Sequence, residues 1–412
     1  MELNKSKIVN DPVHGFISLP GGIINRLIGH IYLQRLRNIK QTGMTYLVYP
    51  GACHNRFQHA LGAMHLMSEA IEALRLKGHD ISHEEAEAVM CAILLHDVGH
   101  GPFSHALEYS IVDNIHHEEL SKLIMEQLNV EFEGRLDLAI AIFTNRYKKH
   151  FLHDLVSSQL DVDRLDYLRR DSFFSGVAEG MIGVERILKM LDVINDSLVV
   201  EAKGIYSIEK FLISRHLMYW QVYLHKTVIA AEQIMMQILR RAKYLSQHGE
   251  DLFATPSLNF FLKNTVSFND FTNPVDGCTP LEHFLNLTDS DIDSAIKIWS
   301  QHTDKVLSTL CHMIIARKLF RTELSKHQFE EGKIAKILAT TQSKLGIDAA
   351  DINYFVIHDE VSNKAYTHDS QSIMIKYNDG KLDNIFNVSD MLSARAFIEV
   401  TRKYMLCYPK FD

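Results

Sequence analysis

The sequence is poor in cysteine and proline. It has 412 residues, yet only five are cysteine and eight are proline. The cysteines are odd in number and form no CxxC pair, which favours buried free thiols in a reducing compartment over disulfides. Because no Pro-rich linker, internal repeat or low-complexity segment interrupts the chain, any domain boundary is gradual.

Long apolar runs and an excess of positive charge are also missing. The longest apolar run, "AVMCAILL", is far too short to span a bilayer, and "MELNKSKIVND" lacks the apolar core of a signal peptide. We therefore expect a cytoplasmic protein with no membrane partner. The formal net charge is −8, which argues against general nucleic-acid binding but permits a small anion in a local basic pocket.

Most of the chain has the apolar spacing of α-helices. The spacing predicts helices over 56–78 and 83–97, one long helix over 208–245, and further helices within 255–330. The predicted fold class is therefore mainly α.

Strand patterns are short and few. Residues 7–20 and 196–208 predict strand pairs, the latter as a hairpin. From about residue 351, strand-like segments followed by a predicted helix over 393–406 indicate a small α+β lobe. We expect a core over 1–250, a helical extension over 251–350 and this lobe over 351–412.

Three histidines and an aspartate gather in "AILLHDVGHGPFSH". His96 and Asp97 stand where the predicted helix ends, and Gly99 follows. Adjacent helical positions point about 100° apart, so both side chains reach one metal only near a helix end. The pair His96 and His100 matches half of the zinc-protease HExxH pattern, but the general-base glutamate is missing.

Two further ligands come from other predicted helices. His59 in "NRFQHALG" and Asp163 in "LDVDRLDYLRRD" complete a set of two imidazoles and two carboxylates. Such a set suits Mn, Fe, Zn or Ni better than Ca, and it leaves positions for water or a phosphate oxygen.

Basic and aromatic side chains recur at helical spacing around these residues. Arg56, Arg164, Arg215 and Lys226 could neutralise a polyphosphate. Each feature alone has a plainer explanation: a single helical histidine is usually an ordinary residue, residues 161–171 could be a solvated charged face, and the stripe 215–219–223 could be amphipathic packing.

The joint pattern resembles the H…HD…D signature of the HD-domain metal-dependent phosphohydrolases. Longer strings are similar, in the same order, to the deoxynucleoside triphosphate (dNTP) triphosphohydrolases, the branch that contains the SAM-and-HD-domain protein and bacterial dGTPases. These strings are "NDPVHGFISL", "QRLRNIKQTG", "YPGACHNRFQHALG", "LLHDVGHGPFSH", "HHEELS", "LDVDRLDYLRRDSF" and "YLHKTV". The similarity is strong from Lys7 to Lys226, and we expect no SAM domain before Lys7.

The resemblance implies an HD-domain helical core, with its motif region at about 50–175, that cleaves a dNTP to deoxynucleoside and tripolyphosphate. It implies a homodimer or homotetramer and one divalent ion (Mn, Fe, Zn, Ni or Mg), with additional Mg on the polyphosphate. The implied metal ligands are His59, His96, Asp97 and Asp163. The implied catalytic group is His105, supported by Glu108 and His117. The implied substrate contacts are Gln41, Arg56, His100, Arg164, Tyr167, Asp171, Arg215, Tyr223 and Lys226.

The sequence departs from the family pattern at four places. Glu108 replaces an aspartate, and Thr42 replaces an apolar residue near the sugar. Gly29 and Glu201 stand where nucleotide-activated members carry effector-binding side chains, so activation by a guanine nucleotide is not predicted. Two alternatives stay open: an HD-domain nucleotidase or phosphodiesterase for another nucleotide, and a non-catalytic protein that binds a nucleotide or single-stranded nucleic acid.

Overall fold

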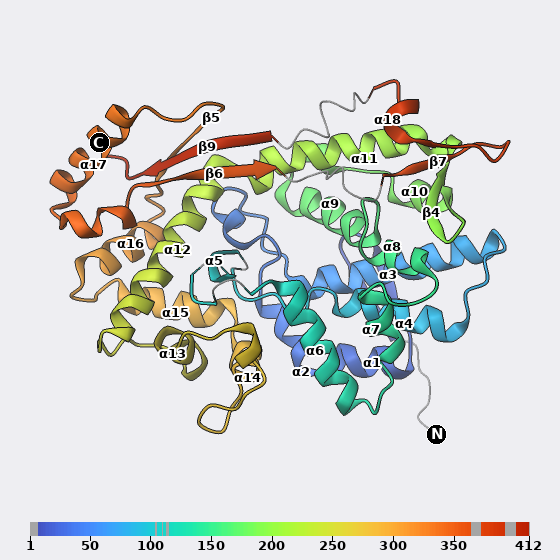
Figure 1. Cartoon of the computed structure of the whole chain (residues 1–412), viewed down its shortest axis with the longest axis horizontal. Coiled ribbons are helices and arrows are strands. Elements are labelled where there is room, and N and C mark those ends of the chain that lie inside the picture. Colours follow the sequence, from blue (N-terminus) through green and yellow to red (C-terminus); the bar gives the residue numbers. More distant parts are fainter. Residues whose placement is uncertain are drawn as a thin grey trace.

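The computed structural model describes the chain from Lys7 to Phe411, except residues 104, 109, 113–114, 364–371 and 392–400. Helices make up most of this part of the chain, which also contains three small sheets; strands β6 (Ile357–Asn363) and β9 (Thr401–Tyr408) lie along the upper edge of the view in Figure 1. The prediction of a mainly α fold is confirmed.

The first ten helices build the half of the molecule that holds the histidine–aspartate motifs. They are α1 (Gly22–Gly29), α2 (Ile31–Arg35), α3 (Arg56–Leu76), α4 (His83–Leu95), α5 (His105–Glu108), α6 (His117–Glu131), α7 (Asp137–Phe143), α8 (His150–Val156), α9 (Val162–Ser175) and α10 (Val184–Met190). The central helix is α3, which packs against α4 and α9. Asn55 and Gln58 form a capping box that fixes where α3 begins.

The later helices extend the molecule and end in the C-terminal region. They are α11 (Ile205–Met218), α12 (Lys226–Gln247), α13 (Pro256–Lys263), α14 (Pro280–Asn286), α15 (Asp289–Trp299), α16 (Lys305–Ile315), α17 (Glu331–Leu345) and α18 (Ile385–Val388). Helix α12 packs against α13, α16 and α5, and so joins the two halves. The helices predicted within 255–330 are present.

The strands form two-, four- and three-stranded sheets. The strands are β1 (Lys7–Asp11), β2 (Gly15–Leu19), β3 (Leu191–Ile194), β4 (Ser197–Glu201), β5 (Arg321–Ser325), β6 (Ile357–Asn363), β7 (Met374–Lys376), β8 (Leu382–Asn384) and β9 (Thr401–Tyr408). The sheet orders are β1-β2, β3-β4-β7-β8 and β5-β9-β6. Strands from beyond residue 351 thus pair with strands from both earlier segments, while the three-part domain division stays a prediction.

The predicted long helix over 208–245 is wrong, because the chain breaks it. A π-helical turn covers Tyr219–Tyr223, where the Leu224 N–H donates to the Tyr219 carbonyl at 2.7 Å. His225 is then extended, and its ring accepts a hydrogen bond from the Thr227 N–H as the N-cap of α12. Periodicity does not register this break because apolar residues continue across it.

One strand prediction and one helix prediction also need correction. The hairpin turns at Asn195 and Asp196, both with positive φ, so β4 is its second strand; a 3₁₀ turn over Ala202–Gly204 follows, and α11 begins at Ile205. The part of the predicted 393–406 helix that the structure describes is strand β9 instead. Its position between β5 and β6 gives both of its edges hydrogen-bonding partners, which outweighs local helical propensity.

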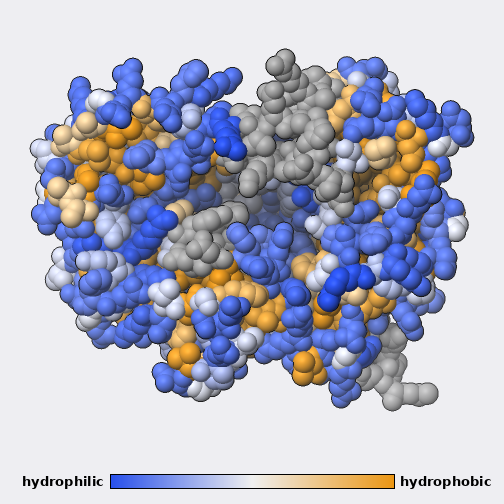
Figure 2. Space-filling view, viewed as in Figure 1, coloured by the Kyte–Doolittle hydropathy of each residue, from blue (hydrophilic) through white to orange (hydrophobic). Residues whose placement is uncertain are grey.

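Within the described residues, no helix combines the length and apolar character that crossing a membrane requires. The face in Figure 2 is mostly hydrophilic, with hydrophobic groups in separate areas.

Candidate functional site

Three predicted ligands from three helices meet at one point. His59 lies one turn into α3, His96 is the C-cap of α4, and Asp163 lies in the first turn of α9. The Nε2 atoms of the two histidines are 3.4 Å apart. Asp163 Oδ1 lies 3.1 Å from His59 Nε2 and 3.4 Å from His96 Nε2. These three atoms lie close enough together to coordinate one ion.

The fourth predicted ligand, Asp97, lies beside this cluster. Its Oδ1 is 3.3 Å from His96 Nε2, and its Oδ2 accepts a hydrogen bond from Arg56 at 2.6 Å. Burial opposes ionisation of Asp97, but His96, His100 and Arg56 outweigh it and hold its pKa well below the usual range. The carboxylate is therefore ionised, and its assignment as the fourth metal ligand stays a prediction.

Hydrogen bonds on the far side of both rings fix their orientation. His96 Nδ1 lies 2.6 Å from the Ile93 carbonyl, and His59 Nδ1 lies 2.8 Å from Asp166 Oδ2. Each of these contacts favours a proton on Nδ1, which leaves Nε2 facing Asp163 as the atom that would give up its proton to bind an ion. A buried set of two imidazoles and at least one carboxylate fits a divalent transition ion or Mg.

Neighbouring charges shift the pKa values of the two histidines His59 and His100 in opposite directions. Burial lowers the pKa of His59, but hydrogen bonds to Asp163 and Asp166 outweigh it and raise that pKa to about 10. For His100 the balance is opposite: burial and the Arg56 guanidinium lower its pKa to about 3. His100 is therefore a neutral imidazole at pH 7.

A cavity of about 430 Å³ adjoins the cluster. Ten predicted residues line it: Gln41, Arg56, Asp97, His100, His117, Asp163, Arg164, Tyr167, Asp171 and Tyr223. Seven lining residues were not predicted as contacts: Thr42, Gly43, Thr45, Phe103, Tyr219, Leu224 and Glu232. Polarity at the metal side and mixed polar and apolar groups elsewhere suit a ligand with a charged and a neutral end.

Several polar atoms of this lining are buried without a hydrogen-bond partner among the described residues. They are Gln41 Oε1, Thr42 Oγ1, His100 Nδ1 and Arg164 Nε. Buried polar groups in proteins are nearly always paired, so a cluster of such atoms around one cavity points to a polar ligand.

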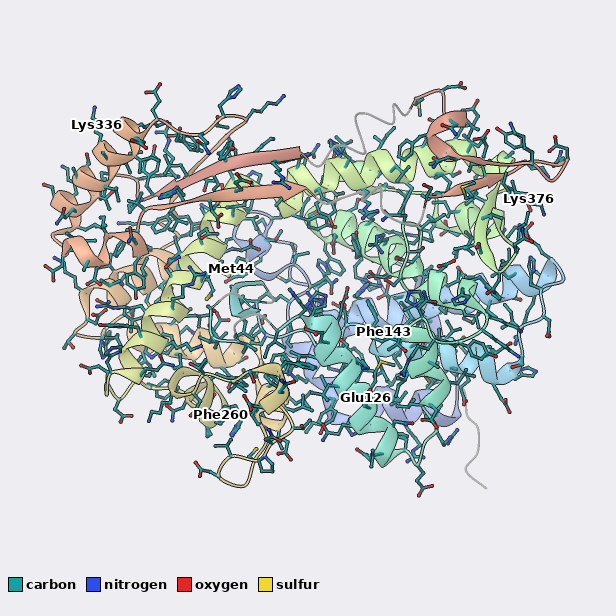
Figure 3. The ribbon with its side chains drawn as sticks, in the orientation of Figure 1. Met44, Glu126, Phe143, Phe260, Lys336 and Lys376 are labelled. Carbon is teal, nitrogen blue, oxygen red and sulfur yellow. The ribbon has the colours of Figure 1, made fainter. Side chains whose placement is uncertain are left out.

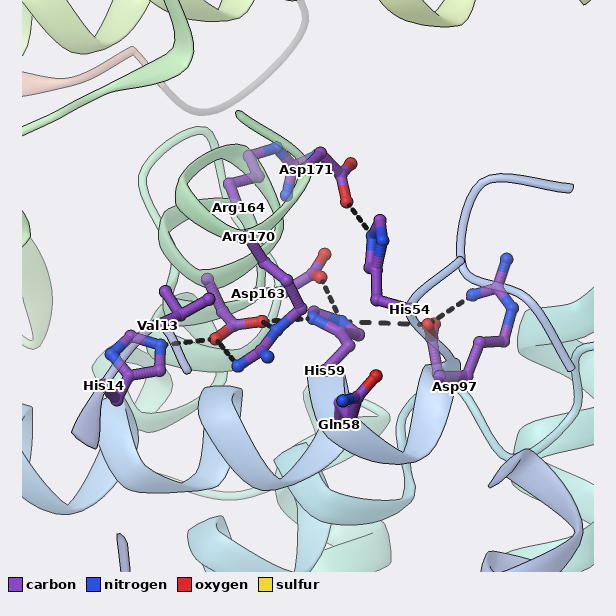
Figure 4. Close-up of polar contacts among 12 residues, drawn as sticks. Val13, His14, His54, Gln58, His59, Asp97, Asp163, Arg164, Arg170 and Asp171 are labelled. Atoms are coloured by element: carbon purple, nitrogen blue, oxygen red, sulfur yellow. Dashed lines mark hydrogen bonds and ion pairs between the residues drawn. The ribbon is translucent and has the colours of Figure 1, made fainter. Parts of the chain in front are cut away.

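Other lining residues hold each other in place. Asp171 accepts hydrogen bonds from Tyr223 Oη at 2.6 Å and from His54 Nε2 at 2.7 Å, the latter drawn in Figure 4. The His100 and His117 rings stack with centroids 3.8 Å apart. Arg164 pairs with Asp161, the N-cap of α9. The cavity wall is therefore largely ordered by internal contacts.

Some predicted residues are not brought to this cavity. Arg215 is buried in α11 and donates to Gln159 Oε1 at 3.0 Å, and Lys226 begins α12; neither is among the lining residues. The backbones of His105 and Glu108 belong to α5, but their side chains lie outside what the structure describes. These four assignments stay predictions.

The sequence alone did not predict His14, Asp166 and Arg170, which lie behind the metal ligand His59, or His54, which bonds the cavity residue Asp171. Each lies in a motif that had been noted: "NDPVHGF", "YPGACHN" or "LDVDRLDYLRRD". Asp166, three residues after Asp163, occupies the same side of a helix, and this spacing was the available signal.

Comparisons with known proteins place these observations in a family. The HD domain matches residues 56–171, and the HD associated region matches residues 182–253. A solved structure of a phosphohydrolase from Bacteroides thetaiotaomicron is 52% identical, with a TM-score of 0.95 over 98% of this chain and 100% of that one.

Curated relatives support the same assignment. The uncharacterized protein YwfO of Bacillus subtilis is 33% identical over 373 residues, which are 89% of this chain and 82% of that protein. The deoxynucleoside triphosphate triphosphohydrolase SAMHD1 homolog of Dictyostelium discoideum is 33% identical over 241 residues, 54% of this chain. The match covers 46% of that relative, so the chain spans about half its length.

Proposed function

The chain belongs to the HD-domain family of phosphohydrolases, and from this premise we propose that it cleaves a dNTP to deoxynucleoside and tripolyphosphate. The observation that carries the proposal is the cavity beside His59, His96 and Asp163, whose lining includes buried polar atoms with no partner among the residues that the structure describes. Similarity to relatives named as dNTP triphosphohydrolases supports the substrate class.

The metal-side residues suit a phosphate group. Bound by His59, His96, Asp163 and Asp97, a divalent ion would supply Lewis-acid activation of phosphorus. Arg56 and Arg164 line the same cavity and offset the negative charge of the phosphates. His100 is neutral, so it lines the cavity beside Arg56 without adding charge.

The remaining roles follow from the resemblance and from the cavity. We assign proton transfer to His105, oriented by Glu108 and His117. Gln41 lies on the wall where the sugar would bind, and its buried Oε1 can accept from a sugar hydroxyl. Tyr223, held by Asp171, lines the same cavity with its aromatic ring. We assign Arg215 and Lys226 to the polyphosphate on the resemblance alone.

A product screen tests the proposal. The four dNTPs are incubated with the protein and Mn²⁺ or Mg²⁺, with and without a second nucleotide, and the products are separated by HPLC. Deoxynucleoside with tripolyphosphate is the expected result. Inorganic phosphate as the sole phosphate product would instead indicate a nucleotidase. Tight nucleotide binding without turnover in Mn, Mg, Co, Fe and Ni would indicate a binding protein.

A further inference from the structure

The carboxylate of Asp166 lies directly behind the metal-side cluster and is fully buried. Its Oδ2 accepts hydrogen bonds from His59 Nδ1 at 2.8 Å and from Arg170 Nε at 2.9 Å. Its Oδ1 accepts from His14 Nε2 at 2.6 Å and from an Arg170 terminal nitrogen at 3.0 Å. Four donors therefore hold this carboxylate, which leaves it little freedom to rotate away from His59.

The donors behind Asp166 are anchored to the N-terminal hairpin. Arg170 is fully buried, and its guanidinium also bonds Asp11 at 2.8 Å and 3.3 Å. Asp11 ends β1 and accepts hydrogen bonds from the Val13 and His14 N–H groups at 2.9 Å and 3.0 Å. The Asp11 side chain thus stabilises the turn that contains His14 and also holds the guanidinium of Arg170. Figure 4 shows His14 and Arg170 approaching the His59 region from separate elements.

Helix packing leaves room for this arrangement at a single glycine. Gly62 lies one turn after His59 in α3, and a Cβ built there would collide with Asp166 and Arg170. The absence of a side chain at this position lets α9 approach α3 closely enough for Asp166 to reach His59.

We propose that Asp11, His14, Asp166 and Arg170 act as positioning residues for the metal ligand His59, so that the N-terminal hairpin is part of the metal-binding apparatus. The inference rests on the proposed function for the presence of a metal. Physically, Asp166 keeps a proton of His59 on Nδ1 and its Nε2 atom aimed at the site, while His14 and Arg170 keep Asp166 in place. None of these four residues touches the cavity described above.

Two substitutions at one position test the proposal. In H14A the donor to Asp166 is lost, whereas in H14Q the side-chain amide can still donate. Affinity for Co²⁺ is measured by titration calorimetry on metal-free protein, together with the visible Co²⁺ spectrum. We expect H14A to weaken binding about 10- to 100-fold and to change the spectrum, and H14Q to restore most of both. G62A, which displaces Asp166, should act in the same direction.

A matched control separates positioning from stability. D192N removes a buried carboxylate bonded to His79 and Lys376, in a cluster that shares no residue with the metal-side network. It should lower the melting temperature of metal-free protein without changing Co²⁺ affinity. If H14A and G62A lower the melting temperature but bind Co²⁺ like the wild type, the network is purely structural and the proposal is wrong.

A metal-independent measurement keeps the proposal distinct from the proposed function. ¹⁵N NMR of histidine-labelled, metal-free protein follows the His59 Nδ1–H group, which donates to Asp166. We expect this proton to exchange slowly with solvent in the wild type and faster in H14A. Equally slow exchange in both would contradict the proposal whether or not the protein hydrolyses nucleotides. Absence of dNTP cleavage with this result as expected would overturn only the proposed function.

Discussion

At the scale of single residues, the candidate site depends on side chains that approach from three helices and share one buried point. Asp163 is the residue whose carboxylate faces both histidine Nε2 atoms. D163A should therefore reduce turnover by more than about 100-fold, because even residues behind a metal ligand typically account for changes up to that size. Steady-state rates and metal content, with circular dichroism to verify folding, check this outcome.

One outcome of the D163A experiment would contradict this expectation. D163A that retains near-wild-type hydrolysis and metal content would remove Asp163 from the metal centre. A control for general disturbance of α9 is R169A, because Arg169 pairs with exposed Glu185 at the protein surface and should leave the rate unchanged.

Much of the candidate site could be predicted at this scale, because the residue types that bind metals and phosphates, and their order in the chain, can be read from the sequence. His59, His96 and Asp163 lie far apart in sequence, yet motif strings were enough to group them. The motif strings could not predict the direction in which each side chain points. Arg215 points to Gln159, and the carboxylate behind His59 belongs to Asp166; both depend on rotamers and helix packing.

At the scale of elements, the turn after α4 is held in place by α6. Ser121 Oγ accepts from the Gly99 N–H at 2.9 Å and donates to the His96 carbonyl at 2.6 Å. A Cβ at Gly99 would collide with the backbone of α6, so the two elements are in close contact. The position of His96 thus depends on this contact.

We predict that S121A destabilises the protein by about 1–3 kcal/mol, because it leaves two buried backbone groups without partners. The free energy of unfolding is measured by urea denaturation. S308A is a suitable control, since the partly exposed Ser308 donates a hydrogen bond to the carbonyl of Asp304, the N-cap of α16. Equal stability of S121A and wild type would show that the contact contributes nothing.

A second element contact, between β7 and β3, depends on pH. Burial raises the pKa of Asp192, but hydrogen bonds from Lys376 and His79 outweigh it and lower that pKa from 3.8 to about 2. Figure 3 labels Lys376, which lies on β7. Because the unfolded state takes up a proton first, this contribution to stability is complete above pH 3.8 and is lost as the pH falls to about 2.

D192N should therefore be less stable than wild type at neutral pH, and the difference should shrink on acidification through that range. Melting temperatures of both proteins across pH 7 to about 2 test this expectation. A difference that stays constant with pH would contradict the role of the Asp192 charge.

Elements were less predictable than residues. The amphipathic helices around the motifs lie where the apolar spacing predicts them, because the apolar face of a helix is formed by residues close together in the sequence. The π-helical break at Tyr219–Tyr223 and strand β9 did not, because both are decided by partners. β9 has partners from residues 321–325 and 357–363, which no local window contains.

At the scale of the whole molecule, strands of the C-terminal segment pair with strands from earlier in the chain. β7 pairs in parallel with β4, and β9 pairs with β5. A chain ending at residue 350 would leave both edges unpaired and expose apolar surface. We expect that truncated protein to be insoluble or to melt far below the full chain; a soluble protein with unchanged melting temperature would show an independent core.

The resemblance also implies a homodimer or homotetramer. Light scattering after size-exclusion chromatography should give a mass of two or four chains of 47.2 kDa. A mass of one chain at micromolar concentration would contradict this prediction. Lone motifs cannot predict assembly, since it depends on surface shape.

The most direct test of the central claim is hydrolysis of a dNTP in H₂¹⁸O, with products analysed by mass spectrometry. Attack of water at the α-phosphorus breaks the bond to the sugar oxygen, so we predict one ¹⁸O in tripolyphosphate and none in the deoxynucleoside. D163A should abolish this incorporation. Label in inorganic phosphate, with a nucleoside diphosphate as the other product, would contradict the account.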